Sequence, residues 1–164
     1  TPKEAVCQVF ENVNTGGVSL TVFELVTAIF AMDNFELRKD WEERQKKYFS
    51  DDILSVTSAT DFLTACTLLS SYKKGGTVSC KKKDVLNLTL AEYQRYADDL
   101  TEGFVEAEKI LQEERIFSSK DLPYTTQLIP LAVLCTLLAD HNSIKTTSVK
   151  DKINEQANTN TTVQ

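Results

Sequence analysis

The sequence is poor in the residues on which many enzymes and metal sites depend. Of its 164 residues, one is a histidine, one a tryptophan and one a methionine. Because His141 has no second histidine to pair with, zinc sites of two or more histidines, including the H-E-x-x-H pattern, are excluded. No Gly-Lys-Ser/Thr phosphate loop is present. A Cys–His nucleophile pair would need His141 beside a cysteine. We therefore assign no catalytic residue and no metal site.

Long apolar runs are also missing. No stretch approaches the roughly 18 apolar residues that a membrane span needs, and the sequence shows no charged-then-apolar leader. The net charge of −6 and the pI near 4.9 disfavour indiscriminate binding to nucleic acids or membranes, because polyanions are repelled on average. We expect a cytoplasmic protein with no membrane contact.

The four cysteines form no C-x-x-C pair. Three of them lie in apolar helical patterns, where a free cysteine behaves as a small hydrophobic residue. Two disulfides are possible by number, but we expect reduced thiols in the core. The cysteines are Cys7, Cys66, Cys80 and Cys135.

Alternation of apolar and polar residues, which indicates strands, appears nowhere in the chain. Helical spacing of three and four residues is common instead. The fold class predicted is all-α, an irregular bundle of about six helices in residues 1–142. Residues 143–164 are polar, and we expect a mobile, partly disordered tail. Helices are predicted near residues 3–13, 22–32, 37–49, 62–72, 90–115 and 128–139, with a helical turn near 83–88. The helix at 37–49 should be exposed and held by a few aromatic anchors, including Tyr48. Residues 55–60 should form a loop, and the paired glycines Gly75 and Gly76 should end the helix that follows it.

Two of these helices have distinctive patterns. Residues 90–115 keep apolar side chains at helical spacing for six turns, after a Thr89-x-x-Glu92 capping box. Residues 128–139 are apolar nearly all round, which predicts a helix in the middle of the bundle. Pro130 should lie in the first turn of that helix or kink it.

A glycine turn at residues 14–17 is the best-specified corner of the chain. Gly16 and Gly17 permit positive φ and close backbone approach, and Thr21 with Glu24 matches a capping box that opens the next helix. This corner should set the angle between two helices that pack on the helix at 128–139. It has two interpretations: the amides beside Asn14 hold a phosphate, or the turn is a tight structural corner.

The same stretch resembles a known family. Its pattern is Phe10-x-x-x-Asn14-x-x-Gly17-x-x-Leu20-x-x-x-Glu24-Leu25. It looks like the second signature of the ParB/sulfiredoxin-like family with the DGQQR motif, found in GmrSD-type restriction systems. The Asp-Gly-Gln-Gln-Arg signature itself is absent. The resemblance implies the helical portion of a prokaryotic nucleotide-dependent phage-defence protein that is inactive alone.

The resemblance also has implications for a parent protein. An upstream α/β part of the same parent chain would be the partner and would bind GTP or ATP, and DNA would be contacted through the parent. No cofactor is expected in this chain itself. The residues implied to bind nucleotide are Asn14, Gly16 and Gly17.

Five lysines flank a short glycine-containing segment and suggest a patch for DNA or phosphate. The alternative is a solvated loop, since no aromatic residues are interleaved. These lysines are Lys73, Lys74, Lys81, Lys82 and Lys83.

Residues Asp98, Glu102 and Glu106 form an acidic helix face with i, i+4 spacing. A divalent cation is not expected there, because hard cations collect oxygen ligands from several segments of a chain. An acidic face on one exposed helix more often keeps a protein soluble.

A second functional hypothesis is a non-catalytic helical protein-protein interaction module, with possible self-association through an open apolar face.

Overall fold

The protein is a bundle of helices, and the all-α prediction is confirmed. The computed structural model describes Ala5, Gln8 and residues 20–50 and 52–142, and this part of the chain contains no strand. None of its helices is both long and apolar enough to cross a bilayer. The helices are α2 (Val22–Ala31), α3 (Leu37–Tyr48), α4 (Ala59–Lys74), α5 (Lys82–Leu86), α6 (Leu90–Glu113) and a last helix whose described part is residues 128–142, with 3-10 turns η1 (Leu54–Val56), η2 (Ser119–Asp121) and η3 (Thr125–Gln127).

Capping boxes open three of the helices. In the box of α2, the Glu24 amide donates to Thr21 Oγ1 at 3.2 Å, and the Thr21 amide donates to the Glu24 carboxylate at 2.7 Å. The box at Thr89 begins α6 in the same way. Both were predicted. The Ser58 box of α4 was missed, because its third helical residue is aspartate rather than glutamate, and α4 begins at Ala59 inside the predicted loop.

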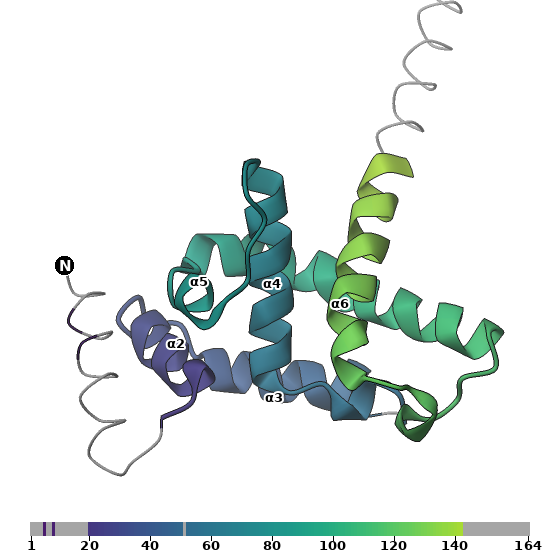
Figure 1. The fold of residues 1–164 in the computed structure, drawn as a ribbon. Coiled ribbons are helices and arrows are strands. Elements are labelled where there is room, and N and C mark those ends of the chain that lie inside the picture. The colour runs from purple at the N-terminus through teal and green to yellow at the C-terminus, as the bar shows by residue number, and fades with distance from the viewer. Residues whose placement is uncertain (1–4, 6–7, 9–19, 51, 143–164) are drawn as a thin grey trace, which may run out of the picture.

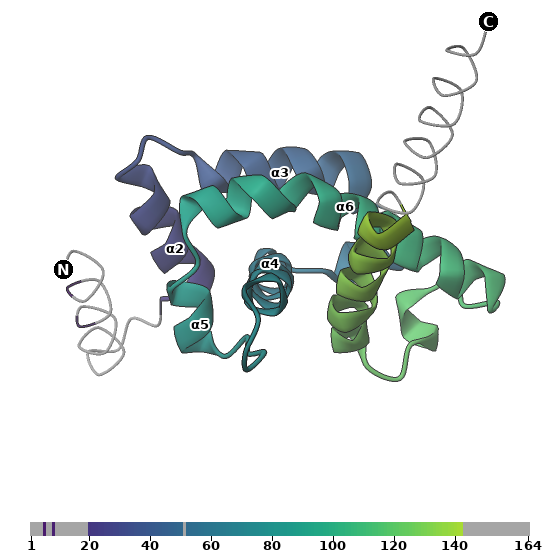
Figure 2. The same ribbon diagram turned by 90° about the horizontal axis from the view of Figure 1, so that it is seen from above.

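The long helices α4 and α6 organise the fold. Figure 1 shows α4 upright in the centre, and Figure 2 shows it nearly end-on, with α3 and α6 running side by side past it. α4 packs against α6, α5 and α2, and α3 packs against α6. α4 ends at Gly75, whose φ of +77° favours glycine, as the paired glycines predicted.

Aromatic side chains fill the centre of the core. Phe62 from α4 contacts the rings of Trp41, Phe49, Tyr93 and Phe104, with centroids 5.3–6.2 Å apart. All five are at most 6% exposed. Edge-on and tilted rings of this kind interlock α3, α4 and α6. The predicted exposed helix at 37–49 is confirmed, although Tyr48 is exposed and does not anchor it.

The last helix occupies the edge of the bundle, so the prediction that it lies in the middle was wrong. Leu134 is 56% exposed and Leu138 is 63% exposed, whereas Leu128 and Ala132 are buried. Only one side of this apolar helix finds a partner within the described fold. Pro130 lies in its first turn, as predicted, where the missing N–H costs no hydrogen bond.

The corner at residues 14–17 and the helix at 3–13 lie outside the described residues, apart from Ala5 and Gln8. So does the tail at 143–164. The next helix after the corner, α2, packs against α3, α4 and α5. In both views α2 lies at the opposite end of the molecule from the last helix. The expectation that α2 packs on the helix at 128–139 was therefore wrong.

The described cysteines are free thiols. Cys66 and Cys135 are buried and Cys80 is half-buried, while Cys7 lies outside the described residues. Burial raises the pKa of the Cys66 thiol. Cys66 thus acts as a small core residue, as the sequence predicted.

Candidate functional site

The predicted nucleotide-binding residues cannot be placed. Asn14, Gly16 and Gly17 all lie outside the described residues. Only the downstream end of the signature is described, where Leu20 packs against the core and Glu24 caps α2. The assignment of these three residues stays a prediction.

The predicted lysine patch is divided between two environments. Lys73 Nζ pairs with Asp140, and Lys74 Nζ pairs with Glu92. These carboxylates neutralise the two lysines at the end of α4. Lys81, Lys82 and Lys83 are exposed at the start of α5 and make no ion pair with the described residues. The unpaired charge is therefore smaller than the sequence suggests.

The predicted acidic face is likewise not uniform. Asp98 pairs with Arg44 at 2.8 Å, and Glu106 pairs with Lys109 at 3.2 Å. Glu102 makes no ion pair with the described residues. No group of three histidine, cysteine or acidic side chains in the described part is arranged to hold a metal.

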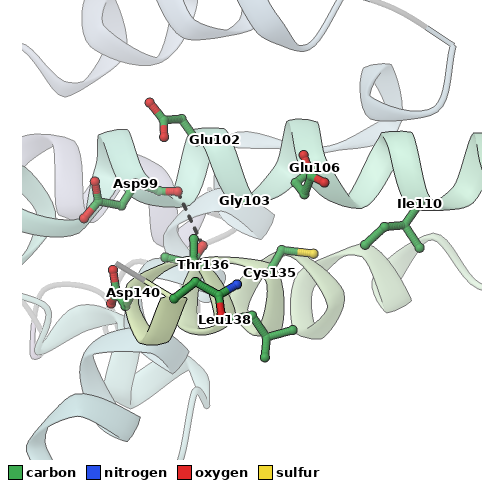
Figure 3. A pocket seen from close by; sticks show the side chains of 11 residues that line it. Asp99, Glu102, Gly103, Glu106, Ile110, Cys135, Thr136, Leu138 and Asp140 are labelled. Carbon is green, nitrogen blue, oxygen red and sulfur yellow. Dashed lines mark hydrogen bonds between the residues drawn. The ribbon is translucent and has the colours of Figure 1, made fainter. Parts of the chain in front are cut away.

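A hollow of the described surface lies between α6 and the last helix, and we call it the α6 groove. It has a volume of about 480 Å³. Figure 3 shows the two helices that form it, with Glu102 and Glu106 extending from α6 and Leu138 from the facing helix. Its main lining residues are Asp99, Glu102, Glu106 and Ile110 from α6, and Cys135, Leu138 and Asp140 from the last helix.

A glycine sets the depth of this groove. An added Cβ at Gly103 would lie 2.1 Å from Thr136 Oγ1 and 2.5 Å from the Ala132 carbonyl oxygen. Only glycine permits so close an approach of the two helices. The Thr136 hydroxyl donates to the Ala132 carbonyl oxygen at 2.9 Å. The Asp99 carbonyl oxygen of α6 is a second acceptor, 3.4 Å from Thr136 Oγ1 (Figure 3). Gly103 and Thr136 therefore form the floor at which the helices cross.

Two ion pairs hold the surroundings of the groove. Lys73 of α4 pairs with Asp140 and ties the far end of the last helix to the bundle. On the other side, Arg44 Nε donates to Asp40 at 2.9 Å and Nη1 donates to Thr101 at 3.0 Å. Burial alone would lower the pKa of the Arg44 guanidinium, but hydrogen bonds to Asp40 and Asp98 outweigh it and raise that pKa. Arg44 thus keeps its charge and joins α3 to α6.

The groove combines apolar side chains with carboxylates. Ile110 is 38% exposed and Leu138 is 63% exposed, while Asp99, Glu102, Glu106 and Asp140 bring only negative charge. Among the described residues, no lysine or arginine lines it. Such a surface suits the binding of an apolar, positively charged group better than acid–base chemistry. We identify the α6 groove as the candidate site.

The sequence held two signals for this site: Gly103, which was missed, and the apolar pattern at 128–139, which was interpreted otherwise. Gly103 interrupts the apolar stripe of a long helix, which commonly marks a close packing contact. The all-round apolar pattern at 128–139 was attributed to burial. An apolar face that is left open produces the same pattern, and only the packing of the helix separates the two cases.

Comparison with known protein families, with curated proteins and with solved structures finds no match to this chain. The resemblance to the DGQQR family therefore stays a prediction. Function is inferred from the site itself.

Proposed function

We propose that this chain is a non-catalytic helical protein-interaction module that docks a partner in the α6 groove. The supporting observation is that Leu138, which is 63% exposed, and Ile110, which is 38% exposed, line the same hollow of the surface. Single exposed apolar residues are ordinary on protein surfaces, but apolar residues gathered in a concave site are typical of binding sites. Leu134, one helical turn before Leu138, extends the apolar strip.

Burial of these side chains supplies the driving force. Full burial of a leucine side chain is worth about 1.5–3 kcal/mol. Because Leu134 and Leu138 are both more than half exposed, most of this free energy remains available to a partner. The close crossing at Gly103 and Thr136 and the Lys73–Asp140 pair hold the groove in shape, which reduces the entropy lost on binding.

A peptide-display selection tests the proposal. The full chain is used as bait for a random peptide library, and enriched peptides are measured against Leu138→Asp. We expect enrichment of peptides whose affinity falls about tenfold or more in the variant, because the aspartate places a charge where an apolar side chain must be buried. Met32→Asp is the matched control, since Met32 is 61% exposed and lies next to α2 at the other end of the molecule.

Two results would reject the groove as a docking face. Enrichment no greater than that on an empty bait is the first. The second is a set of peptides that bind wild type and Leu138→Asp equally well. Circular dichroism of both variants establishes that any loss is not caused by unfolding.

The resemblance to the restriction family supports a second proposal, in which this chain is the helical portion of a cytoplasmic nucleotide-dependent defence protein. The Thr21–Glu24 capping box supports it, because it supplies the helix start that the signature requires. The free thiols of Cys66 and Cys135 agree with a reducing compartment. The nucleotide and the DNA would then be bound by the parent protein, through its upstream α/β part.

This second proposal has its own test. The isolated chain should hydrolyse neither GTP nor ATP and should not cut DNA. In a full-length parent, Asn14→Ala should lower nucleotide hydrolysis without lowering the melting temperature. Unchanged hydrolysis in that variant would remove Asn14 from the nucleotide site.

A further inference from the structure

The rim of the α6 groove carries negative charge that the described fold leaves uncompensated. Four carboxylates line the groove, and no basic side chain from the described part of the chain does. Glu106 is paired with Lys109 and Asp140 with Lys73. Asp99 and Glu102 form no ion pair with the described residues. The groove thus has two carboxylates without an ion-pair partner among the described residues, and its lining also includes the exposed Leu138 and Ile110.

We propose that the partner docked in the α6 groove is a basic amphipathic helix, with an apolar face of leucine-like residues flanked by lysine or arginine. This inference rests on the proposed interaction function and names the chemistry of the partner. Its apolar face covers Leu138, Ile110 and Leu134, and its cations meet Asp99 and Glu102. Opposite charges at the rim guide association and fix the register of the helix in the groove.

The spacing of the groove residues fits a helix. Asp99, Glu102 and Glu106 lie at positions i, i+3 and i+7 of α6, which at 1.5 Å per residue span about 10 Å. Basic residues at i, i+3 or i+4, and i+7 of a partner helix repeat this spacing. Leu134 and Leu138 are four residues apart and present the apolar contacts with the same period.

Other occupants fit less well. A symmetric dimer through this groove would set the carboxylates of one copy against the same carboxylates of the other, and like charges in contact disfavour binding. An extended peptide commonly adds to the edge of a sheet, and the described part of the chain offers no strand. The groove between two helices favours a helical ligand.

The test uses three synthetic peptides of about five helical turns each. The first is an amphipathic leucine–lysine helix, the second has glutamate in place of each lysine, and the third is a scrambled leucine–lysine sequence without an apolar face. Fluorescence anisotropy against the full chain should show that the first binds about tenfold or more tightly than either of the others. The scrambled peptide controls for general attraction to a protein of net charge −6.

Variants of the chain locate the binding. Asp99→Asn/Glu102→Gln should weaken binding of the basic helix about three- to tenfold and reduce its salt dependence. Glu42→Gln/Glu43→Gln changes the net charge equally on the exposed side of α3 and should leave the affinity unchanged. Leu138→Asp should weaken binding although it adds negative charge. Electrostatic attraction alone would strengthen binding of the basic peptide, so a loss would show that the apolar contact is required.

The outcomes distinguish this inference from the interaction function itself. The acidic peptide could bind as tightly as the leucine–lysine peptide or more tightly, and lose that binding in Leu138→Asp. This result would contradict a basic partner but would still support the groove as a docking face. Equal weakening by the α3 control pair would also overturn it. A dimer in sedimentation velocity that Leu138→Asp converts to monomer would assign the groove to a second copy. No binding by any peptide, with a monomeric chain, would reject both.

Discussion

Gly103 of α6 lies directly against Thr136 of the last helix, so closely that a Cβ at position 103 would stand 2.1 Å from the threonine Oγ1. A Gly→Ala change in an exposed helix interior normally stabilises by about 1 kcal/mol. Here we expect Gly103→Ala to destabilise by about 1–3 kcal/mol, because the methyl group also meets the Ala132 carbonyl oxygen. Urea unfolding of wild type and variant measures the difference.

Gly→Ala usually stabilises a helix, whereas Gly103→Ala should destabilise this protein. The sign of the measured change therefore tests the close contact directly. Gln94→Ala, at an exposed position of the same helix, is the matched control and should change stability by less than about 0.5 kcal/mol. If Gly103→Ala were as stable as wild type, the close crossing would be wrong. The variant should also weaken groove binding, since the two walls must move apart.

Tyr93 donates a hydrogen bond from its hydroxyl to Asp40 Oδ2. Tyr93→Phe should therefore cost about 1 kcal/mol at neutral pH. Burial and that hydrogen bond raise the pKa of the Tyr93 phenol above its ordinary value of 10.0. Above this pH the unfolded chain releases the proton while the folded protein retains it, so the free energy of unfolding falls as the pH rises.

In Tyr93→Phe, the free energy of unfolding should fall less steeply as the pH rises, because the buried phenol is gone. Denaturant unfolding of both proteins across pH 9 to about 11 measures the slope, and ultraviolet absorbance of tyrosinate should show one late-titrating tyrosine missing from Tyr93→Phe. Tyr124→Phe, at a 69% exposed position, is the control. Identical alkaline slopes in all three proteins would contradict the role of Tyr93.

Glu92 accepts hydrogen bonds from Thr89 and Ser70 and pairs with Lys74. Burial acts to raise the pKa of the Glu92 carboxyl, but these contacts outweigh it and lower that pKa from 4.5 to about 2. The resulting stability is present above about pH 4.5 and is lost as the pH falls through about 2. Glu92→Gln should lower the free energy of unfolding by about 1–2 kcal/mol at pH 7. This is less than the full pKa shift implies, because solvent screens the partly exposed carboxylate.

The measurement for Glu92 is the free energy of unfolding from pH 7 to about 2, where the wild-type curve should fall more steeply than that of Glu92→Gln. Glu113→Gln is the control, since Glu113 is exposed near the end of the same helix. Parallel curves for wild type and Glu92→Gln would show that the carboxylate contributes nothing to folding.

Cys66 is fully buried and its pKa is raised, whereas Cys80 is half-buried. In a Cys7→Ser/Cys135→Ser background, a thiol reagent should label Cys80 quickly in the native protein. Cys66 should react only as fast as the protein unfolds, because its thiolate is neither formed nor reachable in the core. Fast modification of both thiols at neutral pH, counted by mass spectrometry, would contradict the buried position of Cys66.

Local sequence patterns were enough to locate the helices and many of their ends. Apolar spacing located α2 and α6, the Thr21 and Thr89 boxes marked their starts, and Gly75 marked the end of α4. A capping box or a positive φ depends on residues within one turn, so both can be recognised without knowledge of the fold. The Ser58 box was missed only through the choice of aspartate.

Tertiary packing, in contrast, decided where charges and apolar faces go. The sequence shows five lysines in one segment, but pairing with Asp140 and Glu92 depends on residues far along the chain. The helix at 128–139 is apolar all round, yet Leu134 and Leu138 face outward. Composition sets how apolar a helix is, while the number of neighbours that cover it depends on how the whole chain packs. The α6 groove exists because Gly103 brings α6 close to the last helix, whose exposed leucines find no cover within the described fold.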